Sequence, residues 1–345
     1  MSQTFVIVGG GLAAARAAET LRDRGFDGSV VLISVEEDLP YERPVLSKGY
    51  LLGTESRESA FIHDRRWYDD RDIDLRLGTM VTGVDPAGHQ VLLEDGGRVA
   101  YDRLLLATGS WPRRIDIPGA DLDGVLYLRD LPEADAIHAA IGSGRPLVVV
   151  GAGWIGLEIA AAAREHDVPV TVLEVADLPL QRVLGDEVAQ VFADLHREHG
   201  VDLRLGEGIA SIEGDDGHVS GVVTSGGERL EAAAVVVGIG AAPQSDWAQA
   251  AGLTGTDGLD VDARLRTSDP DIYAAGDIAA VDHPVLGRRV RVEHWAWAND
   301  SGPVVAQAML GEDVSFDALP FFYSDQYDLG MEYIGYAPPG EVDRV

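Results

Sequence analysis

Apolar runs and helical spacing alternate in the opening segment of this chain. Residues 4–8 (TFVIV) are continuously apolar, as expected of a strand buried in a parallel sheet. Alanine and leucine recur at core-facing spacing over residues 12–24, which predicts a helix closed by Gly25. A second apolar run at residues 30–34 completes a strand–helix–strand unit of the usual length. The opening segment is therefore predicted to be an α/β unit.

The same pattern restarts in the middle of the chain. Residues 146–150, 154–165 and 169–174 read as strand, helix and strand. Two prolines and a glycine collect at residues 111–119, where we expect a domain boundary. Shorter elements are expected elsewhere: a polar helix near residues 65–71, and strands near residues 75–77, 90–93, 101–106, 218–224, 233–239 and 271–275.

Each unit joins its first strand to its helix through a glycine-rich turn, with the frame GxGxxA in the first and GxGxxG in the second. The residues of these frames are Gly9, Gly11, Ala14, Gly151, Gly153 and Gly156. Such a turn is tight, lacks a Cβ where the backbone meets a pyrophosphate, and keeps a small residue for helix-on-strand packing. It also aims the free N–H groups of a helix N-terminus at the phosphates. Two such turns predict two bound dinucleotides and electron transfer between them.

Composition narrows the class of protein. With 345 residues, 46% hydrophobic and 25% charged, the chain suits two or three domains of a soluble protein. Its net charge of −31 disfavours nucleic acid and anionic membranes as partners. No apolar run approaches the ~20 residues of a membrane span, and the first residues run straight into a strand, so a cytoplasmic location is expected.

The chain contains no cysteine. Structural disulfides, cysteine-ligated clusters and redox-active thiols are therefore excluded, and no metal site is predicted. Enzymes with two dinucleotides often pass electrons through a thiol. Here the electrons must leave the second cofactor directly.

Acidic residues at strand ends are candidates for ribose recognition. Glu174 lies 23 positions after Gly151, where a carboxylate can accept both ribose hydroxyls of an adenosine and would repel a 2′-phosphate, so NADH is favoured over NADPH. The equivalent strand of the first unit ends at Ser34, followed by Val35 and three acidic residues. We take Glu36 as the first ribose acid, although this assignment stays ambiguous.

Several charged residues outside the turns are also candidates. Arg43 and Lys48 lie in a segment stiffened by prolines, where an arginine could clamp a pyrophosphate and a lysine could stabilise an anionic reduced flavin. Glu158 lies just after the second glycine turn and could face the space between the cofactors. Asp277 follows Gly276 at the end of an apolar strand, where a carboxylate can accept the hydroxyls of a ribityl chain.

Taken in order, a set of segments resembles the FAD-dependent ferredoxin reductases of bacterial oxygenase systems, within the pyridine nucleotide-disulfide oxidoreductase superfamily. The segments are GGGLAAA, LPYERPVLSKGYL, LLLATG, VVVGAGWIGLEIAA, VTVLE, VVVGIG, IYAAGD, RVEHW and FYSDQYDL. The resemblance covers essentially the whole chain. It implies a glutathione-reductase-like α/β fold with two Rossmann-type domains and a partial C-terminal interface domain.

The resemblance also implies residue roles. FAD is expected to bind at Gly9, Gly11, Ala14, Glu36, Arg43, Lys48, Thr108, Gly109, Arg129, Asp277 and Trp295. NADH is expected at Gly151, Gly153, Ile155, Gly156, Glu158, Glu174, Arg182 and Gly240. Lys48, Glu158 and Trp295 are expected beside the reacting flavin ring. Val35 stands where relatives usually carry the acid for the FAD ribose.

In domain terms, the resemblance implies an FAD-binding domain (residues 1–112 and 245–315), an NADH-binding domain (113–244) and a partial interface domain (316–345). Related reductases continue well beyond Val345, so we expect a chain that is truncated or naturally short. The implied activity is electron transfer from NADH through FAD to an iron–sulfur ferredoxin, by a monomer or homodimer. The alternatives are a flavin-only NADH oxidase or quinone reductase, and a redox sensor of the apoptosis-inducing-factor kind.

Overall fold

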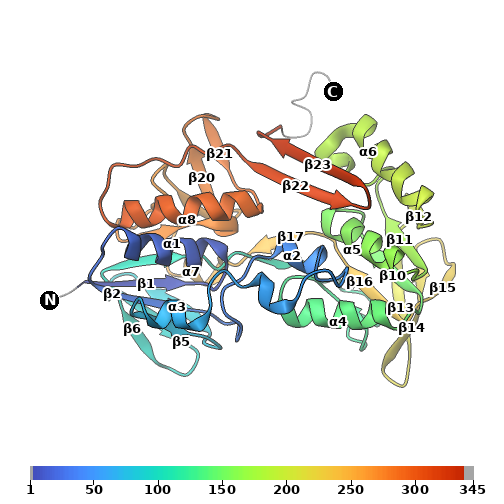
Figure 1. Ribbon diagram of the computed structural model, residues 1–345, viewed down its shortest axis with the longest axis horizontal. Helices are drawn as coiled ribbons and strands as arrows, with labels where there is room; N and C mark the ends of the chain where they lie inside the picture. Colours follow the sequence, from blue (N-terminus) through green and yellow to red (C-terminus); the bar gives the residue numbers. More distant parts are fainter. Residues whose placement is uncertain (1–2, 338–345) are drawn as a thin grey trace.

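The structure, a computed structural model that describes residues 3–337, contains two parallel five-stranded sheets toward opposite ends of the molecule (Figure 1). The first sheet has the order β19-β7-β1-β2-β3, with β1 (Thr4–Val8), β2 (Ser29–Ile33), β3 (Ile73–Arg76), β7 (Arg103–Leu106) and β19 (Ile272–Ala274). The second has the order β12-β11-β10-β16-β9, with β9 (Val125–Leu126), β10 (Leu147–Val150), β11 (Val170–Glu174), β12 (Asp202–Leu205) and β16 (Ala234–Val237). The strand that opens each predicted unit is the central strand of its sheet.

Helices pack around both sheets. Around the first sheet lie α1 (Leu12–Asp23), α3 (Arg65–Asp69), α7 (Asp246–Ala250) and α8 (Trp295–Met309), and near the second lie α4 (Leu131–Gly142), α5 (Trp154–Glu165) and α6 (Gln181–Glu198). The short helix α2 (Pro44–Ser47) contacts both α4 and α5. Two 3₁₀ turns, Arg57–Ala60 and Gly276–Ile278, complete the helical elements of the described residues.

Three smaller sheets are antiparallel or mixed. They are built from β4 (Val81–Asp85), β5 (Gln90–Leu93) and β6 (Arg98–Ala100); from β13 (Ile209–Asp215), β14 (His218–Thr224) and β15 (Arg229–Glu231); and from β18 (Leu259–Val261), β20 (Ala279–His283) and β21 (Arg288–Val290). β8 (Ser110–Pro112) and β17 (Ala241–Pro243) form an antiparallel pair where the chain leaves the first sheet and returns from the second.

The order of the strands creates a crevice at the end of each sheet. From β1 the chain continues to β2 and β3 on one side, whereas β7 and β19 lie on the other side. β10 likewise separates β11 and β12 from β16 and β9. Ligands of open α/β sheets bind beyond the carboxyl ends of the strands at such a reversal point. Each glycine-rich turn follows a central strand, so each lies at a reversal point.

A C-terminal hairpin lies between the two halves of the molecule (Figure 1). Its strands are β22 (Phe321–Gln326) and β23 (Leu329–Ile334), and β22 contacts both α5 and α8. One strand from the end of the chain therefore touches the helix that follows the second glycine turn and the helix that packs on α1.

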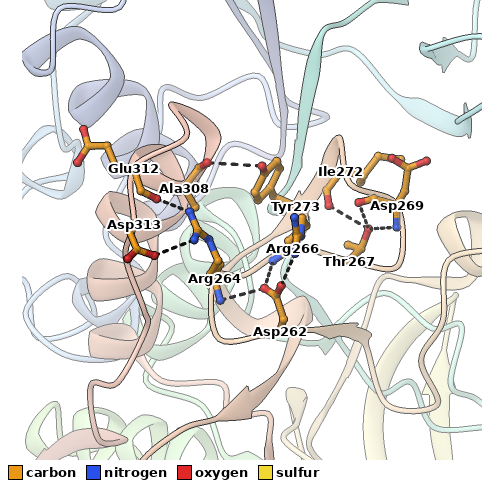
Figure 2. Close-up of polar contacts among 10 residues, drawn as sticks. All are labelled: Asp262, Arg264, Arg266, Thr267, Asp269, Ile272, Tyr273, Ala308, Glu312 and Asp313. Carbon is orange, nitrogen blue, oxygen red and sulfur yellow. Dashed lines mark hydrogen bonds and ion pairs between the residues drawn. The ribbon is translucent and has the colours of Figure 1, made fainter.

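A polar network fixes the loop that precedes β19 against the end of α8 (Figure 2). The Asp262 carboxylate accepts hydrogen bonds from the backbone N–H groups of Arg264 and Arg266, while the Arg264 guanidinium donates to Asp313 at 2.9 Å. At the base of the loop, the Thr267 hydroxyl donates to the Ile272 carbonyl at 2.9 Å. These bonds set the start of β19, and hence the position of the Gly276–Ile278 turn that follows it.

The expected α/β class with two Rossmann-type units is confirmed, and the second predicted helix has the predicted bounds. The hairpin was not predicted as an element. The last eight residues of the expected interface segment, 338–345, and residues 1–2 lie outside the described residues. Within residues 3–337, no helix is both long enough and apolar enough to cross a bilayer.

Close packing of α1 on α8 predicts a test of the fold. A Cβ at Gly302 in α8 would lie 2.6 Å from the Arg16 Cβ and 2.7 Å from the Ala13 carbonyl oxygen, whereas a Cβ at Gly142 in α4 would meet nothing within 4 Å. We expect Gly302→Ala to lower the free energy of unfolding by about 1–3 kcal/mol through overpacking. Gly142→Ala should raise it by about 0.5 kcal/mol by restricting the unfolded chain.

Urea unfolding of the two variants beside the parent chain measures both changes. If both variants unfold at the same urea concentration as the parent chain, then α8 can shift to admit a methyl group, contrary to the packing described.

Candidate functional site

One cavity of about 610 Å³ lies between the two glycine-rich turns. Its wall includes fourteen of the predicted site residues: Gly9, Gly11, Glu36, Arg43, Lys48, Thr108, Gly109, Arg129, Gly153, Ile155, Glu158, Gly240, Asp277 and Trp295. Five others do not line it: Ala14, Gly151, Gly156, Glu174 and Arg182. Residues from both sheets, from the start of α8 and from β22 therefore face a single space.

The glycines of the two turns are needed for different structural reasons. Gly9 has φ +127° and Gly151 has φ +99°, and a Cβ on either would lie within 2.4 Å of a backbone carbonyl oxygen. A Cβ on Gly11 would meet nothing within 4 Å, so the backbone there faces open space. At Gly156 a Cβ would lie 2.1 Å from the Gly151 carbonyl oxygen, which explains the need for glycine at the third position. The first turn has fully buried Ala14 in that place.

Two arginines and two carboxylates meet near the first turn. Arg43 donates to Glu36 at 2.7 Å, and Arg129 pairs with Asp277 at 3.2 Å. Arg43 also donates to the backbone carbonyl of Arg129. Burial, together with the nearby charge of Arg43, lowers the pKa of Arg129. An anion entering the cavity beside these groups would relieve both effects.

Two further glycines and a threonine line the same cavity. Gly109 has φ +69°, and a Cβ there would lie 2.8 Å from a guanidinium nitrogen of Arg129. The Thr108 hydroxyl donates to the Gln244 carbonyl at 3.1 Å, which ties the end of β7 to the chain returning from the second half. Gly240, with φ +97°, also lines the cavity.

Two residues at the start of α8 line the cavity and carry buried polar atoms that have no hydrogen-bond partner among the described residues. These atoms are Nδ1 of His294, at the N-cap position, and Nε1 of Trp295, the first helical residue. Burial lowers the pKa of His294 to about 4, so the imidazole is neutral near pH 7. Buried donors and acceptors rarely remain unpaired in a working protein. The start of α8 therefore carries two polar groups beside the cavity whose partners the described residues do not supply.

An ion pair between Lys48 and Glu158 joins the two halves of the cavity. The Lys48 Nζ lies 2.7 Å from a Glu158 carboxylate oxygen, with 18% and 3% of the respective side chains exposed. Lys48 comes from the end of α2 and Glu158 from α5, so the pair connects the segment after β2 to the helix after the second turn. Of the 27 lysine and arginine residues in the sequence, Lys48 is the single lysine.

Side chains that the sequence analysis did not single out hold Glu158 in place. The hydroxyls of Ser47 and Ser324 both donate to its carboxylate, Ser324 at 2.7 Å. Ser324 in turn accepts from Gln326 Nε2 at 3.0 Å, and Gln326 Oε1 lies 2.8 Å from His196 Nε2. The segment FYSDQYDL contains two of these residues, but nothing in its local pattern indicates contacts 130 and 166 positions away.

Glu174 hydrogen-bonds to the second glycine turn and does not line the cavity. Its carboxylate accepts from the backbone N–H of Ala152 at 2.7 Å and of Ala176 at 2.9 Å, so it fixes the glycine turn that follows β10. Arg182, near the start of α6, is exposed. The structure therefore brings neither residue to the cavity wall, although Glu174 lies at the end of β11 as predicted.

Two Rossmann-type sheets whose glycine turns face one cavity define a dinucleotide-dependent oxidoreductase. Comparison with known proteins specifies the family. Residues 3–302 match the model of the pyridine nucleotide-disulphide oxidoreductase family, and the chain belongs to this family. With no cysteine, it lacks the disulphide of the family name.

Relatives confirm the resemblance to ferredoxin reductases of oxygenase systems. The chain is 40% identical to rhodocoxin reductase of Rhodococcus erythropolis, over 96% of the chain and 78% of the relative. It is 42% identical to the anthranilate 1,2-dioxygenase system ferredoxin–NAD(+) reductase component of Burkholderia cepacia, over 99% and 84%. The solved covalent putidaredoxin reductase–putidaredoxin complex matches with a TM-score of 0.93 and 36% identity, over 96% of this chain and 81% of that chain.

His196, the buried histidine that is hydrogen-bonded to Gln326, predicts a pH dependence of stability. Burial lowers the pKa of His196 from 6.5 to about 4. The unfolded chain therefore binds this proton at a higher pH than the folded chain, so stability falls as the pH drops from about 6.5 to about 4. His196→Asn should remove a slope of up to about 1.4 kcal/mol per pH unit in that interval.

The measurement is urea unfolding at several pH values, with His218→Asn as the control, because 70% of the His218 side chain is exposed. If His196→Asn retains the full slope of the parent chain, then the folded protein does not hold His196 as a neutral group.

Proposed function

We propose that this protein passes electrons from NADH through FAD to a small iron–sulfur ferredoxin that serves an oxygenase. The observation that carries the proposal is the single cavity reached by both glycine turns, with the Lys48–Glu158 ion pair between them. The relatives are named as ferredoxin reductases, and the match to them extends over almost the whole chain. The balanced reaction converts NADH and two oxidised ferredoxins into NAD⁺, two reduced ferredoxins and one proton.

The first half of the cavity suits FAD. Arg43 and Arg129 would hold the pyrophosphate at the start of α1, where the open side of Gly11 allows close approach. Glu36 would accept a ribose hydroxyl, and Asp277 would accept from the ribityl chain. Thr108 and Gly109 would line the same path. Bound FAD supplies a ring that accepts a hydride and releases electrons one at a time.

The second half suits NADH. Gly153 and Ile155 would lie along the dinucleotide at the start of α5, and Gly240 would line the same half of the cavity. Each carboxylate oxygen of Glu174 accepts one backbone N–H and keeps capacity for a ribose hydroxyl. A 2′-phosphate beside that carboxylate would be repelled, so NADH is the preferred donor. Arg182 would have to turn toward the cavity to take part.

Lys48, Glu158 and Trp295 would surround the reacting ring. The ammonium group would stabilise negative charge on the reduced flavin, and Glu158 would keep that ammonium in place. The unpartnered Trp295 N–H supports a contact with a bound polar group. Since the chain contains no cysteine, no thiol relay separates the flavin from the external acceptor.

We also propose three domains: an FAD-binding domain of residues 1–112 and 245–315, an NADH-binding domain of residues 113–244, and a partial interface domain of residues 316–345. The proposed location is cytoplasmic, and the proposed state is a monomer or a homodimer.

Steady-state kinetics with different donors and acceptors test the proposed function. We expect NADH to give a kcat/KM at least about tenfold above that of NADPH, because of Glu174. We expect a ferredoxin to be reduced faster than a quinone or oxygen. Equal values for the two nucleotides would contradict the role of Glu174. Turnover with quinone or oxygen but not with ferredoxin would favour a flavin-only oxidase, and slow turnover with every acceptor would favour a redox sensor.

The single lysine offers a second test. Lys48→Ala should slow the bleaching of the flavin by NADH at least about tenfold. Lys48→Arg should be nearly as slow despite its charge, because a planar guanidinium cannot replace a compact ammonium between Glu158 and the cavity. Stopped-flow absorbance measures both rates, with Arg288→Ala as a surface control. A Lys48→Arg protein with the parent rate would show that position 48 needs only positive charge.

A further inference from the structure

The Ser324 hydroxyl has one proton, and its neighbours decide where that proton points. Gln326 Nε2 lies 3.0 Å from the Ser324 oxygen and can only donate to it. The hydroxyl proton is therefore free to point at the other neighbour, the Glu158 carboxylate at 2.7 Å. Ser324 and Gln326 are each 1% exposed, so water does not compete for these bonds.

The next link fixes the direction of the whole chain of hydrogen bonds. Gln326 Oε1 can only accept, so His196 Nε2, 2.8 Å away, must carry a proton. His196 is fully buried on α6, and burial lowers its pKa, which agrees with a neutral ring protonated at Nε2. Each donor in the series His196, Gln326 and Ser324 points toward Glu158.

Lys48, the partner of Glu158, also lines a cavity that contains other carboxylates. A second cavity of about 290 Å³ lies on the far side of the ion pair and shares both residues with the first cavity. Its walls carry further acidic side chains and two phenols, which belong to Glu42, Glu55, Glu165, Asp325, Tyr323 and Tyr327. The Lys48 Nζ already lies 5.3 Å from the centre of the Tyr323 ring. A Glu158 that could swing away would release Lys48 toward this acidic cavity.

We propose that Ser324 is a positioning residue: its hydroxyl, oriented by Gln326 and His196, fixes the Glu158 carboxylate so that Lys48 stays at the wall of the larger cavity. The functional consequence rests on the proposed function, in which Lys48 acts on a bound flavin. The C-terminal hairpin would thereby complete the reaction centre rather than only cover it.

Because Lys48 is the only lysine of the chain, its accessibility can be measured directly. We suggest brief treatment of the FAD-loaded protein with trace acetic anhydride, followed by mass spectrometry of the peptide that contains Lys48, with the chain's α-amino group as internal reference. Ser324→Ala should raise the acetylation rate of Lys48 about fivefold to tenfold, because a hydrogen bond to a charged group is lost. Ser324→Thr keeps the hydroxyl and should stay within about twofold of the parent protein.

Two further variants keep the test decisive. Gln326→Met leaves Ser324 in place but removes the group that orients its hydroxyl. It should therefore raise the acetylation of Lys48, as Ser324→Ala does. This second variant keeps the proposal testable if Ser324→Ala fails to fold. Ser245→Ala removes a hydroxyl from a buried serine elsewhere in the chain and should leave Lys48 acetylation unchanged.

Two results would overturn the proposal. One is parent-like acetylation of Lys48 in Ser324→Ala and Gln326→Met. The other is an equal increase in Ser324→Ala and Ser324→Thr, which would assign the effect to packing of the hairpin. Acetylation needs no NADH, so a failure of NADH to bleach the flavin would reject the proposed function while leaving this test intact. With that function in place, Ser324→Ala should also lower the rate of bleaching by NADH, and Ser324→Thr should restore it.

Discussion

The buried ion pair between Lys48 and Glu158 links the two halves of this molecule. One partner is at the end of the short helix α2, which follows β2 of the first sheet, and the other is on the helix that begins at the second glycine turn. A buried carboxylate is costly unless it is paired and fully hydrogen-bonded, and here three donors satisfy it. The relative placement of α2, α5 and β22 is thereby restricted, because moving any of them would leave this carboxylate short of a donor.

The composition of the chain gives this pair additional meaning. Of the 27 lysine and arginine side chains, only Lys48 carries an ammonium group, and it lies where the two halves of the cavity meet. The absence of cysteine removes the usual thiol route for electrons. A flavin bound beside Lys48 would then have to exchange electrons with NADH on one side and an external acceptor on the other.

Local patterns predicted the parts of the structure that are set by local physics. Apolar runs identified β1 and β10, and the glycine frames identified turns in which a Cβ at Gly9 or Gly151 would clash with backbone. The hairpin escaped prediction because β23 alternates only between half-buried and exposed positions, a weak signal for a strand. The support of Glu158 by Ser324 joins residues 166 positions apart, and no periodicity records such a contact.

The most direct test of the central claim is a double-mixing stopped-flow experiment under anaerobic conditions. The FAD-loaded protein is first mixed with one equivalent of NADH, and the bleached protein is then mixed with oxidised ferredoxin. The account predicts fast bleaching in the first step and return of the yellow colour in the second, at a rate no slower than steady-state turnover. A flavin that NADH fails to bleach, or a reduced protein that ferredoxin leaves colourless, would contradict it.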